Sequence, residues 1–219
     1  MNEQYINQIV ASVIKTLETK GAINTGSQKG VFDTMSEALE AVSKAYKQYR
    51  EYSVAQREKM IQNIRKLTLE EAGIMAEMGV EETGMGRVED KIIKHQLVAN
   101  KTPGTEDLEP KVKTGDDGLT LIEMAPYGVI GSITPSTNPS ETVICNSIGM
   151  IAGGNAVVFN PHPNACKVAN YAVDLVNRAV LAAGGPENLV VSVKQPTMDT
   201  SNEMVIQSRV WYYYNGRKP

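Results

Sequence analysis

The hydrophobic pattern of the first thirty residues predicts one amphipathic helix followed by a linker. Apolar side chains recur every three or four residues from Ile6 to Leu17, which places them on one face of a helix over residues 1–20. Residues 21–30 are largely small and polar, with almost nothing to bury, so we expect a flexible linker. A helix tethered in this way keeps an apolar stripe that packs on its own domain or on a partner.

Four further helices are predicted between residues 31 and 101. Two capping-box signatures, a Ser or Thr followed three residues later by Glu or Gln, mark helix starts at Thr34 and Ser53. A third helix is expected over about 70–82, with Gly84 as its C-terminal stop, and a fourth over about 88–100. The chain therefore opens with helices alone.

Short apolar runs alternate with helical patterns after Gly118. Strands are predicted over 119–124, 129–134, 156–159 and 189–193, and helices over 142–151 and 164–183. This alternation indicates right-handed crossovers within one parallel sheet. The predicted fold class is α/β, with N-terminal helices followed by part of a Rossmann-like parallel sheet.

Charge and cysteine content narrow the function classes. The net charge is −3 and the pI about 5.5, which does not favour binding to nucleic acid or to an anionic membrane. No apolar run is long enough to span a bilayer, and no secretion signal is present. The two cysteines, Cys145 and Cys166, lack a CxxC spacing and fit a reducing cytosol. We assign no metal-ligating residues.

Three strings of residues carry a family resemblance. They are 82–87 (Glu-Thr-Gly-Met-Gly-Arg), 126–139 (with Pro-Tyr-Gly-Val-Ile and Thr-Pro-Ser-Thr-Asn-Pro) and 154–163 (Gly-Asn-Ala-Val-Val-Phe-Asn-Pro-His-Pro). Together they resemble the aldehyde dehydrogenase superfamily, in particular its CoA-acylating branch. In that branch Thr-Asn-Pro and Asn-Pro-His-Pro replace the Trp-Asn-Phe-Pro and Lys-Pro-Ser of ordinary members. The resemblance covers residues 31–210 and implies a partial NAD-binding domain, an incomplete aldehyde dehydrogenase fold.

The resemblance implies an activity that this chain does not carry alone. In the family, a cysteine thiolate attacks an aldehyde, hydride passes to NAD, and in this branch CoA resolves the thioester. We therefore expect NAD as cofactor, CoA as co-substrate, and a short substrate such as propionaldehyde or acetaldehyde. The nucleophilic cysteine is absent, because neither Cys145 nor Cys166 matches it, and we expect the chain to be inactive alone. Cys145 is expected to be a buried structural residue.

One residue is expected to act on the reacting centre. Asn138 matches the family's oxyanion-hole asparagine, and its carboxamide NH2 is a suitable donor for the oxyanion of a tetrahedral intermediate. Pro135 and Pro139 bracket it in a constrained turn. The alternative is an asparagine that only stabilises a strand-to-helix turn.

The cofactor-binding residues are expected at the ends of the predicted strands, where ligands of open parallel sheets bind. By resemblance they are Thr134, Pro135, Asn160, Pro161, His162, Pro163 and Gly185. The lysine with which ordinary members hold the ribose is absent. His162 is interpreted as a wall of the cofactor site, and Gly185 as a turn near the adenine or, equally, a plain helix C-cap. His95 is expected on the surface of a helix.

The resemblance also implies a location and partners. Members of this branch that work inside bacterial microcompartments carry an amphipathic encapsulation helix ahead of a flexible linker. We therefore expect residues 1–20 to bind a microcompartment shell in the cytoplasm, although the helix could pack on its own domain instead. The 119–124 strand resembles the family's subunit-bridging arm and suggests a homo-oligomer. A non-enzymatic cargo or tethering protein is the alternative function.

Residues 211–219 are aromatic and then basic, and match nothing in the family. If the reading frame is shifted forward by one base, suitable codon choices for this tail can encode Gly-Ile-Ile-Thr-Thr-Gly-Gly. That string resembles the family's next strand and glycine turn, so a frameshift would explain an unrelated tail. On this interpretation the edge of the parallel sheet is left unpaired.

Overall fold

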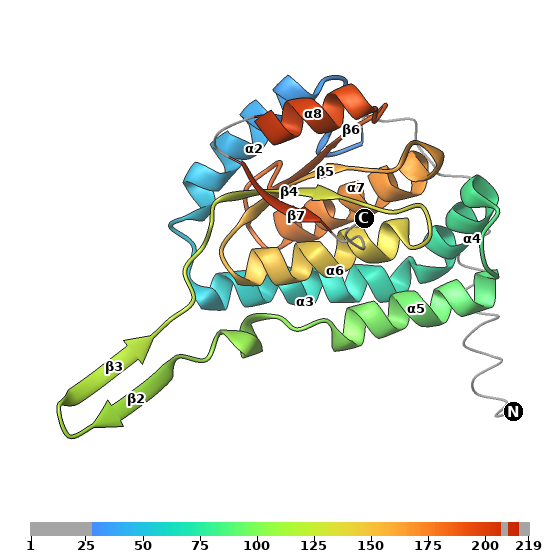
Figure 1. Cartoon of the computed structure of the whole chain (residues 1–219). Helices are drawn as coiled ribbons and strands as arrows, with labels where there is room; N and C mark the ends of the chain where they lie inside the picture. Colours follow the sequence, from blue (N-terminus) through green and yellow to red (C-terminus); the bar gives the residue numbers. More distant parts are fainter. Residues whose placement is uncertain (1–27, 207–209, 215–219) are drawn as a thin grey trace, which may run out of the picture.

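A five-stranded parallel sheet organises the part of the chain that the computed structural model describes, residues 28–206 and 210–214 (Figure 1). Its strands are β1 (Val31–Phe32), β4 (Val129–Ile133), β5 (Ala156–Asn160), β6 (Val190–Val193) and β7 (Val210–Tyr214). They lie in the order β1-β6-β5-β4-β7. Every residue of β5 and β6 is buried, because helices cover both faces of the sheet. The predicted α/β class is confirmed.

Helices form a layer on each side of this sheet (Figure 1). One face carries α6 (Pro139–Ala152) and α7 (Cys166–Ala182), against which α3 (Val54–Glu70) packs. The other face carries α2 (Met35–Tyr49) and α8 (Met198–Ile206). The remaining helices, α4 (Ala72–Thr83) and α5 (Val88–Lys101), pack on α7, α3 and α6 rather than on the sheet, and short 3-10 turns η1 (Thr105–Leu108) and η2 (Pro163–Ala165) connect elements.

Local sequence signals explain where the first helices begin and end. Thr34 and Ser53 form the predicted capping boxes at the starts of α2 and α3. Gly84 ends α4 in a left-handed conformation, with φ 67°, which a residue without a Cβ adopts at little cost. No helix among the described residues is long and apolar enough to cross a membrane.

An antiparallel ribbon of β2 (Lys111–Gly115) and β3 (Gly118–Ile122) projects away from the body of the molecule (Figure 1). Its residues are all exposed, including Val112, Leu119 and Leu121. The predicted strand at 119–124 therefore exists, but it lies outside the main sheet. An isolated two-stranded ribbon is marginal in water, and the rest of the described chain leaves these apolar side chains uncovered.

The fifth strand corrects the expectation of an unpaired sheet edge. β7 pairs in parallel with β4 along its whole length, from Val129↔Val210 to Ile133↔Tyr214. The run Val-Trp-Tyr-Tyr-Tyr consists of β-branched and aromatic residues, which favour strands whether or not a frameshift produced them. α8, which the hydrophobic pattern did not predict, provides the crossover from β6.

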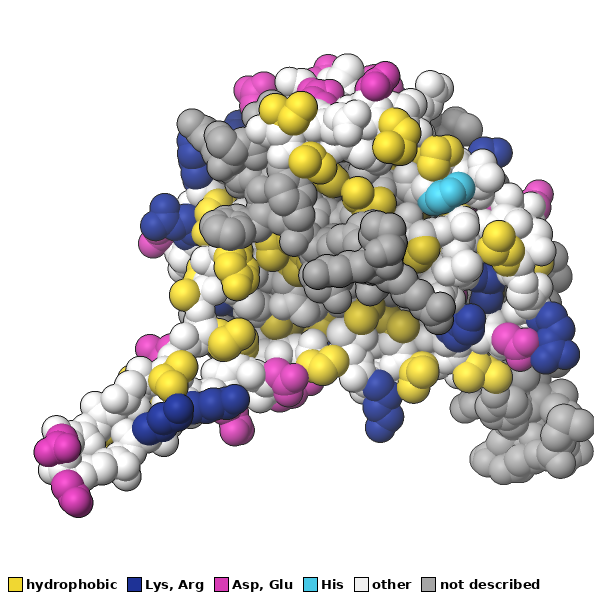
Figure 2. Space-filling view, in the orientation of Figure 1, with side chains coloured by type: hydrophobic (Ala, Val, Ile, Leu, Met, Phe, Trp, Pro, Cys, Tyr) yellow, Lys and Arg dark blue, Asp and Glu magenta, His cyan; other side chains and the backbone are white. Residues whose placement is uncertain are grey.

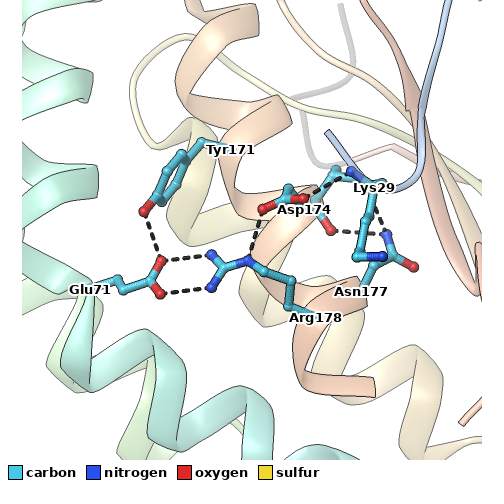
Figure 3. Close-up of polar contacts among 7 residues, drawn as sticks. Lys29, Glu71, Tyr171, Asp174, Asn177 and Arg178 are labelled. Carbon is cyan, nitrogen blue, oxygen red and sulfur yellow. Dashed lines mark hydrogen bonds and ion pairs between the residues drawn. The ribbon is translucent and has the colours of Figure 1, made fainter. Parts of the chain in front are cut away.

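A polar network on α7 joins three distant segments of the chain (Figure 3). Arg178 donates from both terminal nitrogens to Glu71, each at 2.8 Å, and from Nε to Asp174 at 2.8 Å. The Tyr171 hydroxyl also donates to Glu71, at 2.8 Å. Asp174 in turn accepts from the backbone N–H of Lys29 at 2.8 Å. The network therefore anchors α4 and the segment ahead of β1 to the same helix.

Gly30 completes this anchor, because the backbone approaches α7 too closely for a side chain. Its φ is +78°, and a Cβ would lie 2.3 Å from Asn177 Nδ2 and 2.5 Å from the carbonyl oxygen of Val190. Asn177 donates to that same carbonyl at 2.6 Å. A side chain at position 30 would displace both contacts.

Replacing Arg178 with Met is expected to lower the free energy of unfolding at pH 7 by about 2–3 kcal/mol, because two carboxylates lose charge-assisted hydrogen bonds. Burial opposes ionisation of Glu71, but the Arg178 and Tyr171 hydrogen bonds outweigh it and lower the pKa of Glu71. This stabilisation is present above the unfolded pKa of about 4.3 and lost as pH falls through the folded value. Urea titrations at pH 7 and pH 3.5 should show a smaller difference at the lower pH.

The matched control is Arg178→Lys, which keeps the charge but not the planar fork and should fall between wild type and Arg178→Met. Equal unfolding midpoints for wild type and Arg178→Met at pH 7 would show that the network contributes nothing to stability.

Candidate functional site

The order of the strands predicts where along the carboxyl ends of the strands a ligand binds. The chain advances from β4 to β5 to β6 in one direction, then returns through α8 to place β7 on the other side of β4. Ligands of open α/β sheets bind outside the carboxyl ends of the strands, where the strand order reverses. That point lies between β4 and β7, so the segments that follow β4 and β5 line the candidate site.

The segments after β4 and β5 meet there as predicted. The backbone N–H of Thr134 donates to the carbonyl of Asn160 at 3.3 Å, which joins the two strand ends. Thr134 is buried, and its hydroxyl has no hydrogen-bond partner among the described residues. Pro135 is half-buried and Pro161 is buried beside them. This edge thus holds a buried polar atom that the described residues do not satisfy.

The two residues after Pro161 lie at the surface. His162 is exposed, and its Nδ1 accepts from the backbone N–H of Asn164 at 3.1 Å, which caps the short turn η2. Pro163 is also exposed and begins that turn. The imidazole therefore has a structural contact on one side and solvent on the other.

The side chain of Asn160 makes its hydrogen bonds within the protein. Its Nδ2 donates to Ser201 Oγ at 2.6 Å, and its Oδ1 accepts from Thr200 Oγ1 at 2.7 Å. These contacts tie the end of β5 to the first turn of α8. Thr197 and Thr200 also cap each other's backbone, at 2.8 and 3.1 Å. A Thr-x-x-Thr spacing is the sequence signal for this helix start, and the hydrophobic pattern does not reveal it.

Gly185 does not lie with the other candidates. It falls between the end of α7 and the start of β6, which is the amino-terminal edge of the sheet. A Cβ here would lie 2.5 Å from Val180 Cγ1 and 2.8 Å from Met60 Cε. The close packing of α7 and α3 accounts for this glycine without a ligand.

Asn138 occupies the turn between β4 and α6. It is the N-cap residue of α6, but its side chain makes no capping hydrogen bond. Instead, its Oδ1 accepts from Lys94 Nζ on α5 at 3.1 Å. The residue is half-buried, so its carboxamide borders the site.

A buried ion pair lies beneath this turn. Lys91 and Glu141 have side chains only 3% and 5% exposed, and Lys91 Nζ lies 3.6 Å from Glu141 Oε1. The same ammonium donates to the backbone carbonyl of Thr137 at 3.3 Å. Glu141 Oε1 has no hydrogen bond among the described residues, so the ion pair is its main compensation.

His95 is fully buried beside this pair, and the prediction that it lies on a helix surface was wrong. Its Nδ1 lies 2.7 Å from the carbonyl oxygen of Lys91, and its Nε2 lies 2.9 Å from Ser140 Oγ. Because a carbonyl only accepts, Nδ1 carries a proton, and in the neutral ring Nε2 accepts from the Ser140 hydroxyl. Its burial was hard to predict, because Lys91, one turn earlier on the same buried face of α5, is of a residue type that is normally exposed.

The free energy of unfolding is expected to fall as pH drops below about 6.5, the ordinary value for histidine. Burial lowers the pKa of His95, and the charges of Lys91 and Lys94 add to this against the opposing carboxylate of Glu141. The unfolded chain then binds a proton that the folded chain does not, so stability is lost as pH falls through the folded value. Urea unfolding between pH 5 and 8 measures the slope. A His95→Gln variant should have a smaller slope, and parallel curves would contradict the assignment.

The two cysteines differ from an activated nucleophile. Cys145 on α6 and Cys166 at the start of α7 are both half-buried, so Cys145 is less buried than expected. Burial and the Glu82 carboxylate raise the pKa of Cys166. Glu82 itself caps α7 by accepting from the backbone N–H groups of Lys167 and Val168, each at 2.8 Å. The helix N-terminus is therefore already neutralised and does not activate the thiol.

The sequence model of the aldehyde dehydrogenase family matches residues 15–212. The chain belongs to this family. The acetylating acetaldehyde dehydrogenase EutE of Salmonella typhimurium is 48% identical over 205 residues, which cover 93% of this chain and 44% of that protein.

Solved structures give the same family. A propionaldehyde dehydrogenase from the Clostridium phytofermentans fucose utilisation bacterial microcompartment superposes with a TM-score of 0.81 and 58% identity, over 83% of this chain and 42% of that one. A Rhodopseudomonas palustris propionaldehyde dehydrogenase with bound CoA and an acylated cysteine gives 0.82 and 48%, over 85% and 43%. The chain thus spans less than half the length of these aldehyde dehydrogenases, and the family prediction from the three strings is confirmed.

Proposed function

We propose that this chain forms the cofactor-binding part of an NAD-dependent, CoA-acylating aldehyde dehydrogenase acting on a short aldehyde such as acetaldehyde or propionaldehyde. The observation that carries the proposal is the Asn138 turn, which follows β4 at the reversal of strand order. The relatives described above support the acyl transfer to CoA, since one holds CoA and an acylated cysteine.

In this proposal, Asn138 donates from Nδ2 to the oxyanion that forms when a thiolate adds to the aldehyde carbonyl. The thiolate comes from the part of the relatives' length that this chain does not span. A bound nicotinamide cofactor would supply the hydride acceptor. Thr134 and Pro135 after β4, and 161–163 after β5, form the wall that orients it.

One feature of this end of the sheet fits such a cofactor. The buried Thr134 hydroxyl lacks a hydrogen-bond partner among the described residues, and a bound ligand would supply one. The side chain of Asn160 stabilises this end of the sheet by binding α8. Gly185 lies at the opposite ends of the strands and takes no part in cofactor binding. Asn160 therefore contributes through its backbone and its hold on α8.

The partners and location follow the same proposal. Residues 1–20 would direct the enzyme to a microcompartment shell in the cytoplasm, and the ribbon of β2 and β3 would join subunits of a homo-oligomer. The proposed helix and residues 21–27 of its linker lie outside the described residues. The source of one relative in a bacterial microcompartment supports this location.

A chimeric enzyme tests the proposal. Residues 28–206 would replace the matching segment of the C. phytofermentans propionaldehyde dehydrogenase, which is 58% identical there. The chimera is expected to form NADH and acyl-CoA from propionaldehyde or acetaldehyde, CoA and NAD. Assays with NADP in place of NAD measure the cofactor preference, and the unaltered relative is the control. A folded chimera that consumes no aldehyde with either cofactor would contradict the proposal.

A further inference from the structure

Helix α5 holds the turn that carries Asn138 at three points. Lys91, Lys94 and His95 lie three and four residues apart, which places them on one face of the helix. That face contacts the turn and the first residues of α6. Lys91 reaches Thr137, Lys94 reaches Asn138 and His95 reaches the residue two positions further on.

The outer two contacts hold residues on both sides of Asn138, through a backbone carbonyl before it and through side chains after it. Lys91 Nζ binds the carbonyl just before Asn138 and pairs with Glu141 just after it. His95 is fully buried and holds Ser140 at 2.9 Å. Because these groups are buried, the turn has little freedom to move relative to α5.

The middle contact decides which way the carboxamide of Asn138 faces. Lys94 Nζ lies 3.1 Å from Asn138 Oδ1. An ammonium has three donors and no acceptor, so it attracts the carboxamide oxygen and repels the NH2 group. Turning the carboxamide over would set two donors against each other. Within the described residues, Nδ2 makes no hydrogen bond and remains available as a donor.

We propose that Lys94 is a positioning residue, which orients the Asn138 carboxamide so that its NH2 group faces the reacting centre. The meaning of this role rests on the proposed function, in which Nδ2 is the oxyanion donor. The geometry itself does not depend on that function, because it concerns only the side chains of Lys94 and Asn138. Lys94 does not touch the substrate and acts through Asn138.

The side-chain NH2 cross peaks of Asn138 in a 1H–15N spectrum of the full 219-residue chain test the proposal directly. Their assignment comes from their loss in Asn138→Asp. Lys94→Met removes the donor from Oδ1 and is expected to shift both cross peaks. Lys94→Arg keeps a donor-only side chain and should leave them in place. Lys94→Glu offers an acceptor instead, so the carboxamide turns over and an NH2 proton moves downfield as it donates to the new carboxylate.

Lys94 is exposed, so these variants are expected to fold, and the backbone cross peaks report whether they do. Unchanged Asn138 cross peaks in Lys94→Met would overturn the proposal, as would equal shifts in Lys94→Arg and Lys94→Met. Failure of the proposed enzyme function is a separate result, because the chimera assay measures turnover and this spectrum measures only the orientation of one carboxamide.

Discussion

Replacing Lys91 with Met is expected to lower the free energy of unfolding by about 3–5 kcal/mol, the range for breaking one partner out of a buried ion pair. The variant leaves the Glu141 carboxylate with a 5% exposed side chain and no cation. Its Oε1 has no hydrogen bond that would compensate, and the methionine side chain fills the space of the lysine stem without the charge. Urea unfolding at pH 7, followed by circular dichroism, measures the change.

Two matched variants separate charge from packing. Lys94→Met removes a lysine from the same face of α5, but this residue is exposed, so a change within about 0.5 kcal/mol is expected. The double variant Lys91→Met with Glu141→Gln removes both charges and should recover most of the lost stability. If Lys91→Met proves no more costly than Lys94→Met, the ion pair has no structural role.

Replacing Asn138 with Ala is expected to lower kcat of the chimeric enzyme by about 10²–10³, the range for removing one oxyanion donor. KM should change little, because the oxyanion exists only in the transition state and the tetrahedral intermediate. Stability should also change little, since the Asn138 side chain does not cap α6. Steady-state kinetics with varied aldehyde separates kcat from KM.

The neighbouring Thr137 offers the control. Its side chain is exposed and only its backbone carbonyl is bound, so Thr137→Ala should keep the kcat of the chimera. An Asn138→Ala chimera with full kcat would return this residue to the simpler interpretation, an asparagine that only shapes a strand-to-helix turn.

Sequence patterns predicted the elements whose signals are local. The starts of α2 and α3 follow from capping boxes, and β5 follows from a short run of apolar residues between turn signals. α8 was missed because its first turn contains Thr, Asp and Ser, and its cap is a pair of threonines rather than a capping box. β7 was not predicted, because residues 211–219 were interpreted by family likeness rather than by strand propensity.

The expected residues at the ends of β4 and β5 lie close together, because backbone topology alone decides this. Side-chain partners far apart in sequence were beyond reach. His95 and Ser140 are 45 residues apart, and only the packing of α5 on α6 brings them together. The periodicity of hydrophobic residues also does not predict which of them stay exposed. Several large hydrophobic side chains, among them Met198 and Ile206, are exposed. Figure 2 shows hydrophobic side chains scattered over one face of the molecule.

The position of β1 sets an order in which the sheet is completed during synthesis. Among the described residues, β1 pairs only with β6, with Val31 beside Ser192, and the backbone N–H of Lys29 binds Asp174 across 145 residues. At roughly 5–20 residues per second, the ribosome needs about 8–30 s to make the segment between these strands. Throughout that time the first strand has no neighbour to pair with. β1 is therefore the first strand of this sheet to leave the ribosome and among the last to pair.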